Sequence, residues 1–432
     1  MKNSSSKLLS SVAVGAAAFA VVLAALPSGS ARANPRRILI FPGQRSRPAP
    51  VVRTLLRPRG NVASPAPCTE QFGEGYSFVG VTMGGNVAGG DDTAILGGNS
   101  NDACDEYAGV GVGLFNTVAG AGDATYSFVA GGAYNGILGG ESFIGAGNHG
   151  IVSGNGSFIG AGDFEYSQGG GSTPGNQVSG SDSFIGAGDE NIVSANEAFV
   201  GSGLANSIGS AATYSTILGG ARNVISGEYS SVLGGYGNTA GGEYAIVAGG
   251  NTSSATGELS FAAGYHADAL HSGSFVWSDF GSGSALLKDT ASNQFVVRAS
   301  GGASLYSNET MTSGVKLAAG SGTWAALSDR NAKTDVAALD DDSVLAKVGS
   351  LPVSTWRYTS ESGVRHVGPM AQDFYAAFGV GEDDRHITSI DEDGVALAAI
   401  KALRADSLRK GAEIVALRAE LDHVEAILAA RH

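Results

Sequence analysis

Ser328 and Lys333 are the residues of this sequence whose types and spacing could carry out covalent chemistry. A serine hydroxyl is a weak nucleophile until a base removes its proton. A lysine amine is such a base only while uncharged, which requires burial or a neighbouring cation, and Arg330 is a candidate for that cation. An activated Ser328 could attack the carbonyl of Leu327, its own upstream neighbour, and form an ester that water cleaves. Serine and lysine occur at this spacing on most protein surfaces, so the pair alone identifies no site.

Three segments in order give the pair a context. The first is Ala-Leu-Ser-Asp-Arg-Asn-Ala-Lys at 326–333, the second is Arg-His-Val-Gly-Pro-Met-Ala-Gln-Asp at 365–373, and the third is Ala-Ile-Lys-Ala-Leu at 399–403. Together they resemble the intramolecular chaperone domain of endosialidase-type tailspikes, classed as peptidase S74, over roughly 328–410. Asn-Ala at 331–332 replaces the bulkier residues that often precede the lysine in that family.

The resemblance implies that Ser328 and Lys333 form a dyad that cuts the chain once, between Leu327 and Ser328. A donor must stabilise the oxyanion, and a backbone N–H, Gln372 and His366 are the alternatives. Intertwined β-fibres form slowly because their contacts are non-local, and their unpaired edges aggregate. A chaperone domain that holds three chains in register would help such a fibre fold, and its removal by cleavage would trap the fibre kinetically.

The segments that must position the pair have the composition of an α+β domain, expected at 328–432. Apolar spacing predicts a helix over 335–348, a strand over 353–358, and a turn and helix over 368–378. A coiled-coil helix is expected at about 396–430, because apolar residues there are spaced 3, 4, 3 and 4. A lone amphipathic helix on a globular core is the alternative. The seam residues are Ile414, Leu417, Leu421, Val424 and Leu428.

A repeated segment fills residues 76–275. Each copy begins with serine or another small residue, continues with aromatic or aliphatic residues, and reaches glycine; most copies follow at fifteen residues. One step of twenty-six residues contains an insertion around 164–175. A unit this short predicts one coil of a β-solenoid, with two short strands and two tight turns, and glycine where φ is positive or coils pack closely. The copies begin at Ser127, Ser142, Ser157, Ser183, Ala198, Ser215, Ser230, Ala245, Ser260 and Ser274, with weaker copies at Ser77, Thr93 and Ala108.

The repeat resembles the head repeats of trimeric autotransporter (YadA-like) adhesins. The resemblance implies a mainly β fold: a trimeric, left-handed parallel β-roll or solenoid of 14–15-residue coils. A small β connector is expected at 276–327, before the α+β chaperone domain with its coiled-coil helix. The sequence shows no counterpart of that family's C-terminal membrane barrel, so the mode of anchoring stays open.

The N-terminus predicts export. Residues 1–33 have a basic start, an apolar stretch and an Ala-Arg-Ala cleavage pattern, which is typical of a signal peptide; an uncleaved anchor is the alternative. Residues 34–75 form an arm that holds seven arginines and no acid between 34 and 60. It is either a solvated flexible arm or a foothold on an anionic surface. Cys68 and Cys104 are the only cysteines and are expected to form a disulfide after export.

Composition excludes several functions. The net charge of −14 argues against nucleic acid as a partner. No motif indicates a metal or cofactor. We therefore expect a secreted or cell-surface homotrimeric fibre, adhesin-like, with an unidentified glycan or protein ligand. The alternative is a secreted, tailspike-like glycan-degrading enzyme processed by the same chaperone, with acids such as Asp163, Asp182, Asp189 and Glu190, although these acids occupy turn positions and solvated turns explain them better. A third interpretation makes the solenoid a passive spacer.

Overall fold

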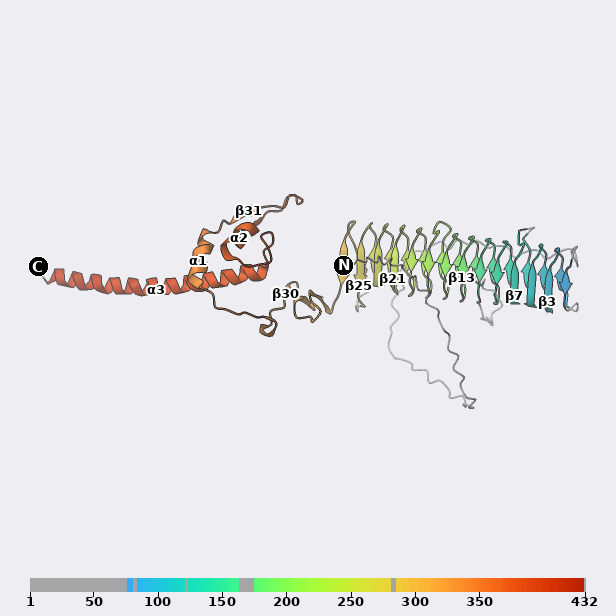
Figure 1. Cartoon of the computed structure of the whole chain (residues 1–432), viewed down its shortest axis with the longest axis horizontal. Helices are drawn as coiled ribbons and strands as arrows, with labels where there is room; N and C mark the ends of the chain where they lie inside the picture. Colours follow the sequence, from blue (N-terminus) through green and yellow to red (C-terminus); the bar gives the residue numbers. More distant parts are fainter. Residues whose placement is uncertain (1–75, 81–83, 121–122, 163–174, 281–284, 431–432) are drawn as a thin grey trace, which may run out of the picture. The chain divides into compact units, whose positions relative to one another are not determined.

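The computed structural model describes residues 76–80, 84–120, 123–162, 175–280 and 285–430. The predicted signal peptide, the arm, Cys68 and nearly all of the insertion lie outside these residues and stay predictions. The described chain is mainly β: a parallel β-solenoid, then two small antiparallel sheets and three α-helices (Figure 1).

Each coil of the solenoid gives one strand to each of two parallel sheets (Figure 1). The first sheet has fourteen strands, in the order β1 (Phe78–Val79), β3 (Ala94–Asn99), β5 (Gly109–Leu114), β7 (Phe128–Ala133), β9 (Phe143–Ile144), β11 (Phe158–Ile159), β13 (Phe184–Ile185), β15 (Phe199–Val200), β17 (Thr216–Ile217), β19 (Ser231–Val232), β21 (Ile246–Asn251), β23 (Phe261–Tyr265), β25 (Phe275–Ser278) and β27 (Phe295–Arg298). The second has thirteen strands, in the order β2 (Val87–Ala88), β4 (Asp102–Ala103), β6 (Thr117–Val118), β8 (Gly136–Ile137), β10 (Ile151–Val152), β12 (Gln177–Val178), β14 (Ile192–Val193), β16 (Ser207–Ile208), β18 (Val224–Ile225), β20 (Thr239–Ala240), β22 (Ser254–Ala255), β24 (Ala267–Ala269) and β26 (Leu287–Lys288).

The register of the strands confirms the predicted parallel coils. Phe143 pairs with Phe158 fifteen residues on, and Phe158 pairs with Phe184 across the insertion, so the insertion leaves the ladder in register. The fourteen-residue step is also kept, with Phe261 opposite Phe275. The left hand of the coil and the trimer stay predictions.

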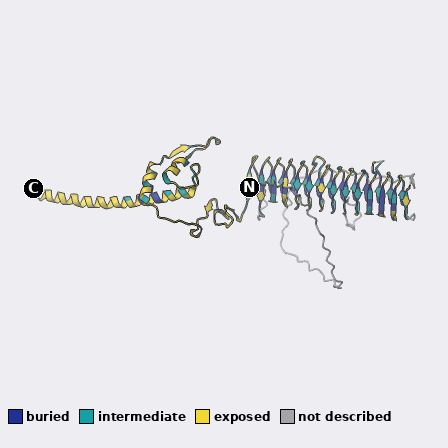
Figure 2. Cartoon of the chain, in the orientation of Figure 1, coloured by how far each residue is buried: buried dark blue, intermediate teal, exposed yellow. Residues whose placement is uncertain are grey.

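The interior is a column of aliphatic side chains. The residues that carry them are among those coloured as buried in Figure 2. In the two-residue strands from β2 to β22 the second residue points inward, as Ile159 and Val193 do, and is almost completely buried. β-Branched residues suit these positions because they pack well on a pleated surface. One coil could not cover this surface alone, but neighbouring coils cover it on both sides.

Two columns of buried polar side chains run beside the aliphatic core. In one, each serine hydroxyl bridges coils: Ser142 Oγ donates to the Gly154 carbonyl at 2.9 Å and accepts from the Ser157 N–H at 3.1 Å. In the other, which has two runs, the amide of each asparagine after the first of its run donates to the asparagine one coil before it. These columns satisfy backbone groups at the corners, which would otherwise be buried without partners. The asparagine column consists of Asn86, Asn101, Asn116 and Asn135, and then Asn176, Asn191, Asn206, Asn223 and Asn238.

One sequence expectation about the corners is only partly right. Glycine was expected wherever φ is positive, yet many corners place a bulky residue there, such as Tyr214 (φ 58°), Tyr229 (φ 54°) and Tyr244 (φ 56°). This conformation costs an L-residue roughly 1–2 kcal/mol. The tyrosine rings offset part of that cost because they stack on one another, with centroids 5.0 Å apart in both pairs.

The solenoid continues past the expected boundary at residue 275. β26 pairs with β24 and β27 pairs with β25, both in parallel, so a further coil lies inside the segment expected to be the connector. The guanidinium of Arg298 holds this coil, because it donates to Asp279 Oδ1 at 3.1 Å and to Ser278 Oγ at 2.6 Å. The antiparallel connector follows as β28 (Gly302–Tyr306), β29 (Gly314–Ala318) and β30 (Trp324–Ala326).

The C-terminal part combines helices with one small hairpin. Its elements are the short 3₁₀ helix η1 (Arg330–Ala332), α1 (Asp341–Ser350), β31 (Ser354–Trp356), β32 (His366–Gly368), α2 (Ala371–Phe378) and α3 (Ser389–Ala429). The expected helix at 335–348 begins later than predicted because the Asp340 side chain caps α1, accepting from the Ser343 N–H at 3.2 Å. α1 packs on α3 around Val344, Ala398 and Ala399.

The distal part of α3 is exposed (Figure 2). Ile414, Leu417, Leu421, Val424 and Leu428 are each at least half exposed. Among the described residues, no helix is at once long enough and apolar enough to cross a membrane. The coiled coil predicted for this segment stays a prediction, and it would explain why so much apolar surface remains on one helix.

Asp102 gives the solenoid a testable pH dependence. It lies on β4 between Val87 and Thr117, and burial raises its pKa from 3.8 to about 6. Because the folded-state pKa is the higher one, the buried charge costs stability above pH 6, and the cost disappears as the pH falls toward 4. Asp102→Asn should stabilise the protein by about 1–2 kcal/mol at pH 7.5, allowing for partial solvation, and should have no effect at pH 4. Thermal unfolding of both proteins at the two pH values tests this, and an equal gain at both would contradict it.

Candidate functional site

The segment that carries Ser328 is held by a turn of its own. It follows β30, and the Leu327 N–H donates to the Gly314 carbonyl at 2.9 Å, which fixes the residue before the serine. Asp329 then caps η1, with its carboxylate accepting from the Asn331 N–H at 2.9 Å. Aspartate is a favoured N-cap, so Asp329 could have been recognised from the sequence as the residue that starts this turn. That role was not among the predictions made from the sequence.

The turn brings Lys333 back to Ser328. Lys333 Nζ donates a hydrogen bond of 2.6 Å to Ser328 Oγ. Two side chains whose chain positions differ by five therefore meet at the distance that a nucleophile and its base require. Both residues are exposed.

The short contact does not by itself activate the serine. A serine hydroxyl is activated only when a neutral amine accepts its proton. Water favours the charged amine, so removal of water from the dyad would favour the reactive form. A single chain therefore brings the two side chains within hydrogen-bond distance but leaves both of them exposed to water.

The structure does not join the other candidate residues to the dyad by hydrogen bonds within the described part of the chain. Arg330 is exposed in η1, Gln372 is exposed in the first turn of α2, and His366 lies on β32. Within the described ranges, none of the three makes a hydrogen bond to Ser328 or Lys333. The oxyanion donor thus stays unassigned.

His366 belongs instead to an aromatic cluster on the hairpin. Its Nε2 is 2.9 Å from Glu361 Oε2, and its ring stacks on Trp356 with centroids 4.7 Å apart. Tyr358 meets both rings edge-on. These partners were not predicted from the sequence, because they come from a strand and a turn that only the hairpin brings together.

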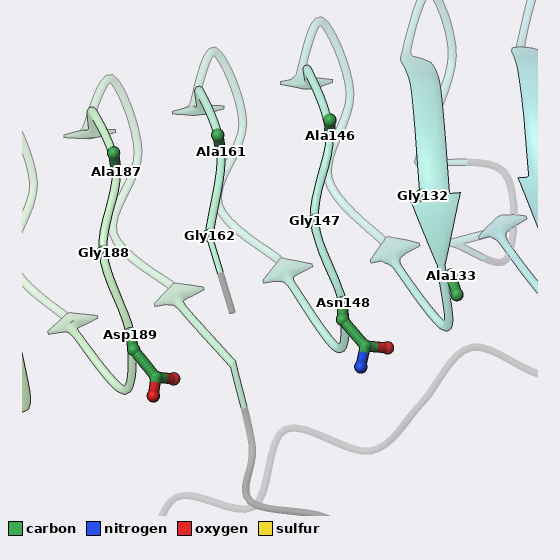
Figure 3. Close-up of a pocket in the computed structure, with 10 residues that line it drawn as sticks. All are labelled: Gly132, Ala133, Ala146, Gly147, Asn148, Ala161, Gly162, Ala187, Gly188 and Asp189. Atoms are coloured by element: carbon green, nitrogen blue, oxygen red, sulfur yellow. The ribbon is translucent and has the colours of Figure 1, made fainter. Parts of the chain in front are cut away.

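A hollow of about 790 Å³ lies at one corner of the solenoid (Figure 3). Glycine and alanine line most of it, and Asn148 and Asp189 supply its polar side chains. Of the acids named for a glycosidase, Asp189 lies here, Asp182 and Glu190 occupy positive-φ turns, and Asp163 is outside the described residues. Among the described lining residues only one is acidic, whereas glycosidases usually use two carboxyl groups.

Cys104 is disulfide-bonded. Cys68, the partner that the sequence predicts, lies outside the described residues. The described residues contain no group of three histidine, cysteine or acidic side chains that could hold a metal ion.

Comparison with known families agrees with the segment around the dyad. Residues 328–380 match the family model described as chaperone of endosialidase, peptidase S74, which confirms the resemblance stated from the sequence. The match begins at Ser328 and includes the segment at 365–373, while the segment at 399–403 lies beyond it. No curated protein matches the chain.

The fold and the match together define a class of protein. A chaperone domain of the endosialidase type follows a parallel β-solenoid, and the chaperone family implies trimeric assembly. This combination fits a fibre whose C-terminal domain serves as a trimerisation chaperone.

Proposed function

We propose that this protein is an exported, homotrimeric, adhesin-like surface fibre whose C-terminal chaperone cuts the chain once between Leu327 and Ser328. The observation that carries the proposal is the 2.6 Å hydrogen bond between Lys333 Nζ and Ser328 Oγ at the first residue of the matched domain. Ser328 Oγ attacks the Leu327 carbonyl and Lys333 takes the hydroxyl proton. Lys333 then returns that proton to the amide nitrogen of Ser328, which leaves as an amine when the C–N bond breaks. The resulting ester joins Leu327 to Ser328 through Oγ, and water hydrolyses it.

Assembly supplies the burial that the single chain lacks. Both dyad residues are exposed, and a neighbouring copy that covers them would displace water from the dyad, where burial favours the uncharged form of an amine. Cleavage then follows assembly instead of preceding it, which suits a chaperone that must remain attached until the chains are in register.

The exposed seam of α3 supports a trimer. Its apolar residues recur at intervals of three and four, and an isolated helix with such a stripe would expose it to water. Parallel packing of three α3 helices buries the stripe and aligns the three chains from their C-terminal ends.

Export is supported by the disulfide at Cys104, because disulfides persist in oxidising compartments and are rare in the cytosol. The signal peptide proposed at 1–33 and the basic arm at 34–75 would then place the mature fibre outside the cell. Its ligand, a glycan or a protein, is not identified by these features.

The test is intact mass, with native mass, of the folded full-length protein. The proposal expects two fragments, one ending at Leu327 and one beginning with Ser328. It also expects cleavage to slow when the protein is folded at low concentration, because assembly must come first. A folded trimer of uncut chains would make the C-terminal domain a permanent clamp and would overturn the proposed cleavage.

A further inference from the structure

The hollow at the corner of the solenoid spans four successive coils, which contain β7, β9, β11 and β13 (Figure 3). Ala146, Ala161 and Ala187 line it in one row, with one alanine from each of three coils. The glycines of the lining are required by the fold, because a Cβ on Gly147 would lie 2.6 Å from the Gly162 carbonyl oxygen. Small side chains thus leave a hollow about 14 Å long, at about 4.8 Å per coil.

Two polar side chains lie at this corner where neighbouring coils have apolar ones. Asn148 pairs with Ala133 of the coil before it, and Asp189 pairs with Leu204 of the coil after it. Both polar residues line the hollow and lie at the same end of their coils (Figure 3). Because alanine and leucine occupy the same ladder in adjoining coils, the backbone of the corner does not require a polar residue. Asn148 and Asp189 therefore need a reason other than the fold.

The amide of Asn148 is not fully used by the fold. Its Oδ1 is buried, and no donor within the described ranges meets it. The asparagines of the buried column differ in this respect: Asn191 Nδ2 donates to Asn176 Oδ1, and Asn191 Oδ1 accepts from Asn206 Nδ2. A buried acceptor without a partner is unfavourable and rare in proteins. A bound molecule that brings a donor to Asn148 would remove this penalty.

The insertion in the repeat begins and ends at this hollow. The chain passes Gly162, which lines the hollow, before the insertion, and it returns at Gly175, where a Cβ would lie 2.5 Å from the Asn148 carbonyl oxygen. Both strand ladders continue across the insertion in register, so the coils do not need the extra residues. In repeat proteins, insertions often lie on the face that binds a ligand. The place of the insertion therefore favours ligand binding at this corner.

The lining selects the chemical class of the ligand. Its alanines and glycines offer an apolar surface that suits the C–H groups of a sugar ring. Asn148 supplies N–H donors and a C=O acceptor, while Asp189 supplies acceptors only. A hydroxyl group both donates and accepts, so sugar hydroxyls match this pair. An anionic sugar would be repelled by Asp189, since the described lining contains no lysine or arginine to offset that charge.

We propose that this hollow binds a neutral oligosaccharide, whose hydroxyl groups donate to Asn148 Oδ1 and to the Asp189 carboxylate while its C–H groups lie on the row of alanines. The inference rests on the proposed surface fibre and adds the chemical class of its ligand and the place where that ligand binds. The described lining has a single carboxyl group, which suits binding without hydrolysis, because glycosidases usually use two.

An array of neutral, acidic and amino-bearing oligosaccharides, with cellotetraose and maltotetraose among the neutral ones, tests the site on the folded full-length protein. The wild type should bind neutral members. Asn148→Leu should weaken their binding at least about tenfold, because both polar groups of the amide are lost. Asn251→Leu is the matched control, since Asn251 belongs to the same kind of ladder position beside Tyr236 and lies outside the described lining of the hollow. It should bind like the wild type.

Two more variants separate the shape of the hollow from its charge. Ala161→Phe fills the hollow without changing a polar group and should also weaken binding at least about tenfold. Asp189→Asn keeps an acceptor and removes the charge, so binding of neutral members should fall by less than about tenfold. Unchanged binding by Asn148→Leu and Ala161→Phe, or no binding of any neutral oligosaccharide by the wild type, overturns the inference. A preference for amino-bearing oligosaccharides that Asp189→Asn abolishes also overturns it, because the ligand is then a cation.

Native mass and intact mass of the same samples separate this inference from the proposed function. A cleaved trimer that binds no oligosaccharide refutes the site and leaves the proposed fibre intact. An uncut monomer refutes the proposed fibre, and the array then decides the site by itself. A cleaved trimer that binds neutral oligosaccharides, and loses them in Asn148→Leu and Ala161→Phe but not in Asn251→Leu, supports both.

Discussion

Ser328→Ala is expected to leave every chain uncut, with the rate of cleavage after Leu327 reduced by at least about a thousandfold. The reason is that no other group lies at the position from which the serine oxygen attacks, 2.6 Å from Lys333 Nζ. Lys333→Ala should have the same effect, because the hydroxyl then has no base. The measurement is intact mass of each folded protein over time after assembly.

Two further variants separate catalysis from folding. Lys333→Arg keeps a positive charge but supplies no base, since a guanidinium is not deprotonated in proteins, so it should assemble and remain uncut. Lys347→Ala removes an exposed lysine from α1 and should cleave like the wild type. Native mass must show a trimer in every case. Normal cleavage by assembled Ser328→Ala or Lys333→Arg would exclude the dyad mechanism.

The two residues of the dyad lie close together in the sequence, which is why the sequence could indicate the site. The serine, the cap and the lysine lie within six residues, so one short turn decides the geometry. The surroundings that would make Lys333 a base are not local. In the proposed mechanism a second copy of the chain supplies them, and nothing in the segment from 326 to 333 specifies that copy.

The solenoid was predictable for a related reason. A serine followed by an inward aliphatic residue recurs at a fixed spacing, and each copy makes the same contacts with the next. The last coil was missed because β26 and β27 join the ladder without that pattern, after steps of twenty residues. The bulky corner residues were missed because the ladder contacts that hold a tyrosine at positive φ belong to neighbouring coils, which a single copy of the repeat does not show.

Asn223→Leu is expected to lower the free energy of unfolding of the solenoid by about 4 kcal/mol per chain. Asn223 is completely buried, and its Nδ2 donates to Asn206 Oδ1 at 3.0 Å and to the Gly235 carbonyl at 3.1 Å. Its own Oδ1 accepts from the backbone N–H of Asn238 at 3.0 Å and from Asn238 Nδ2 at 3.1 Å. Leucine has a similar volume but no polar atoms, so it would leave the buried N–H of Asn238 without its acceptor and would remove one hydrogen bond each from Asn206 Oδ1 and the Gly235 carbonyl.

A graded series makes this prediction specific to the asparagine column. Asn223→Ser should cost less, because Ser253 already takes the equivalent place in its own coil, where its N–H donates to Asn238 Oδ1 at 2.9 Å and its Oγ donates to the Gly264 carbonyl at 2.9 Å. Val224→Leu, at the outward neighbour on β18, should change stability by less than about 0.5 kcal/mol. Denaturant unfolding of the three variants measures the order. If Asn223→Leu is as stable as Val224→Leu, the buried amides make no net contribution, and the solenoid is held by its aliphatic column and strand ladders alone.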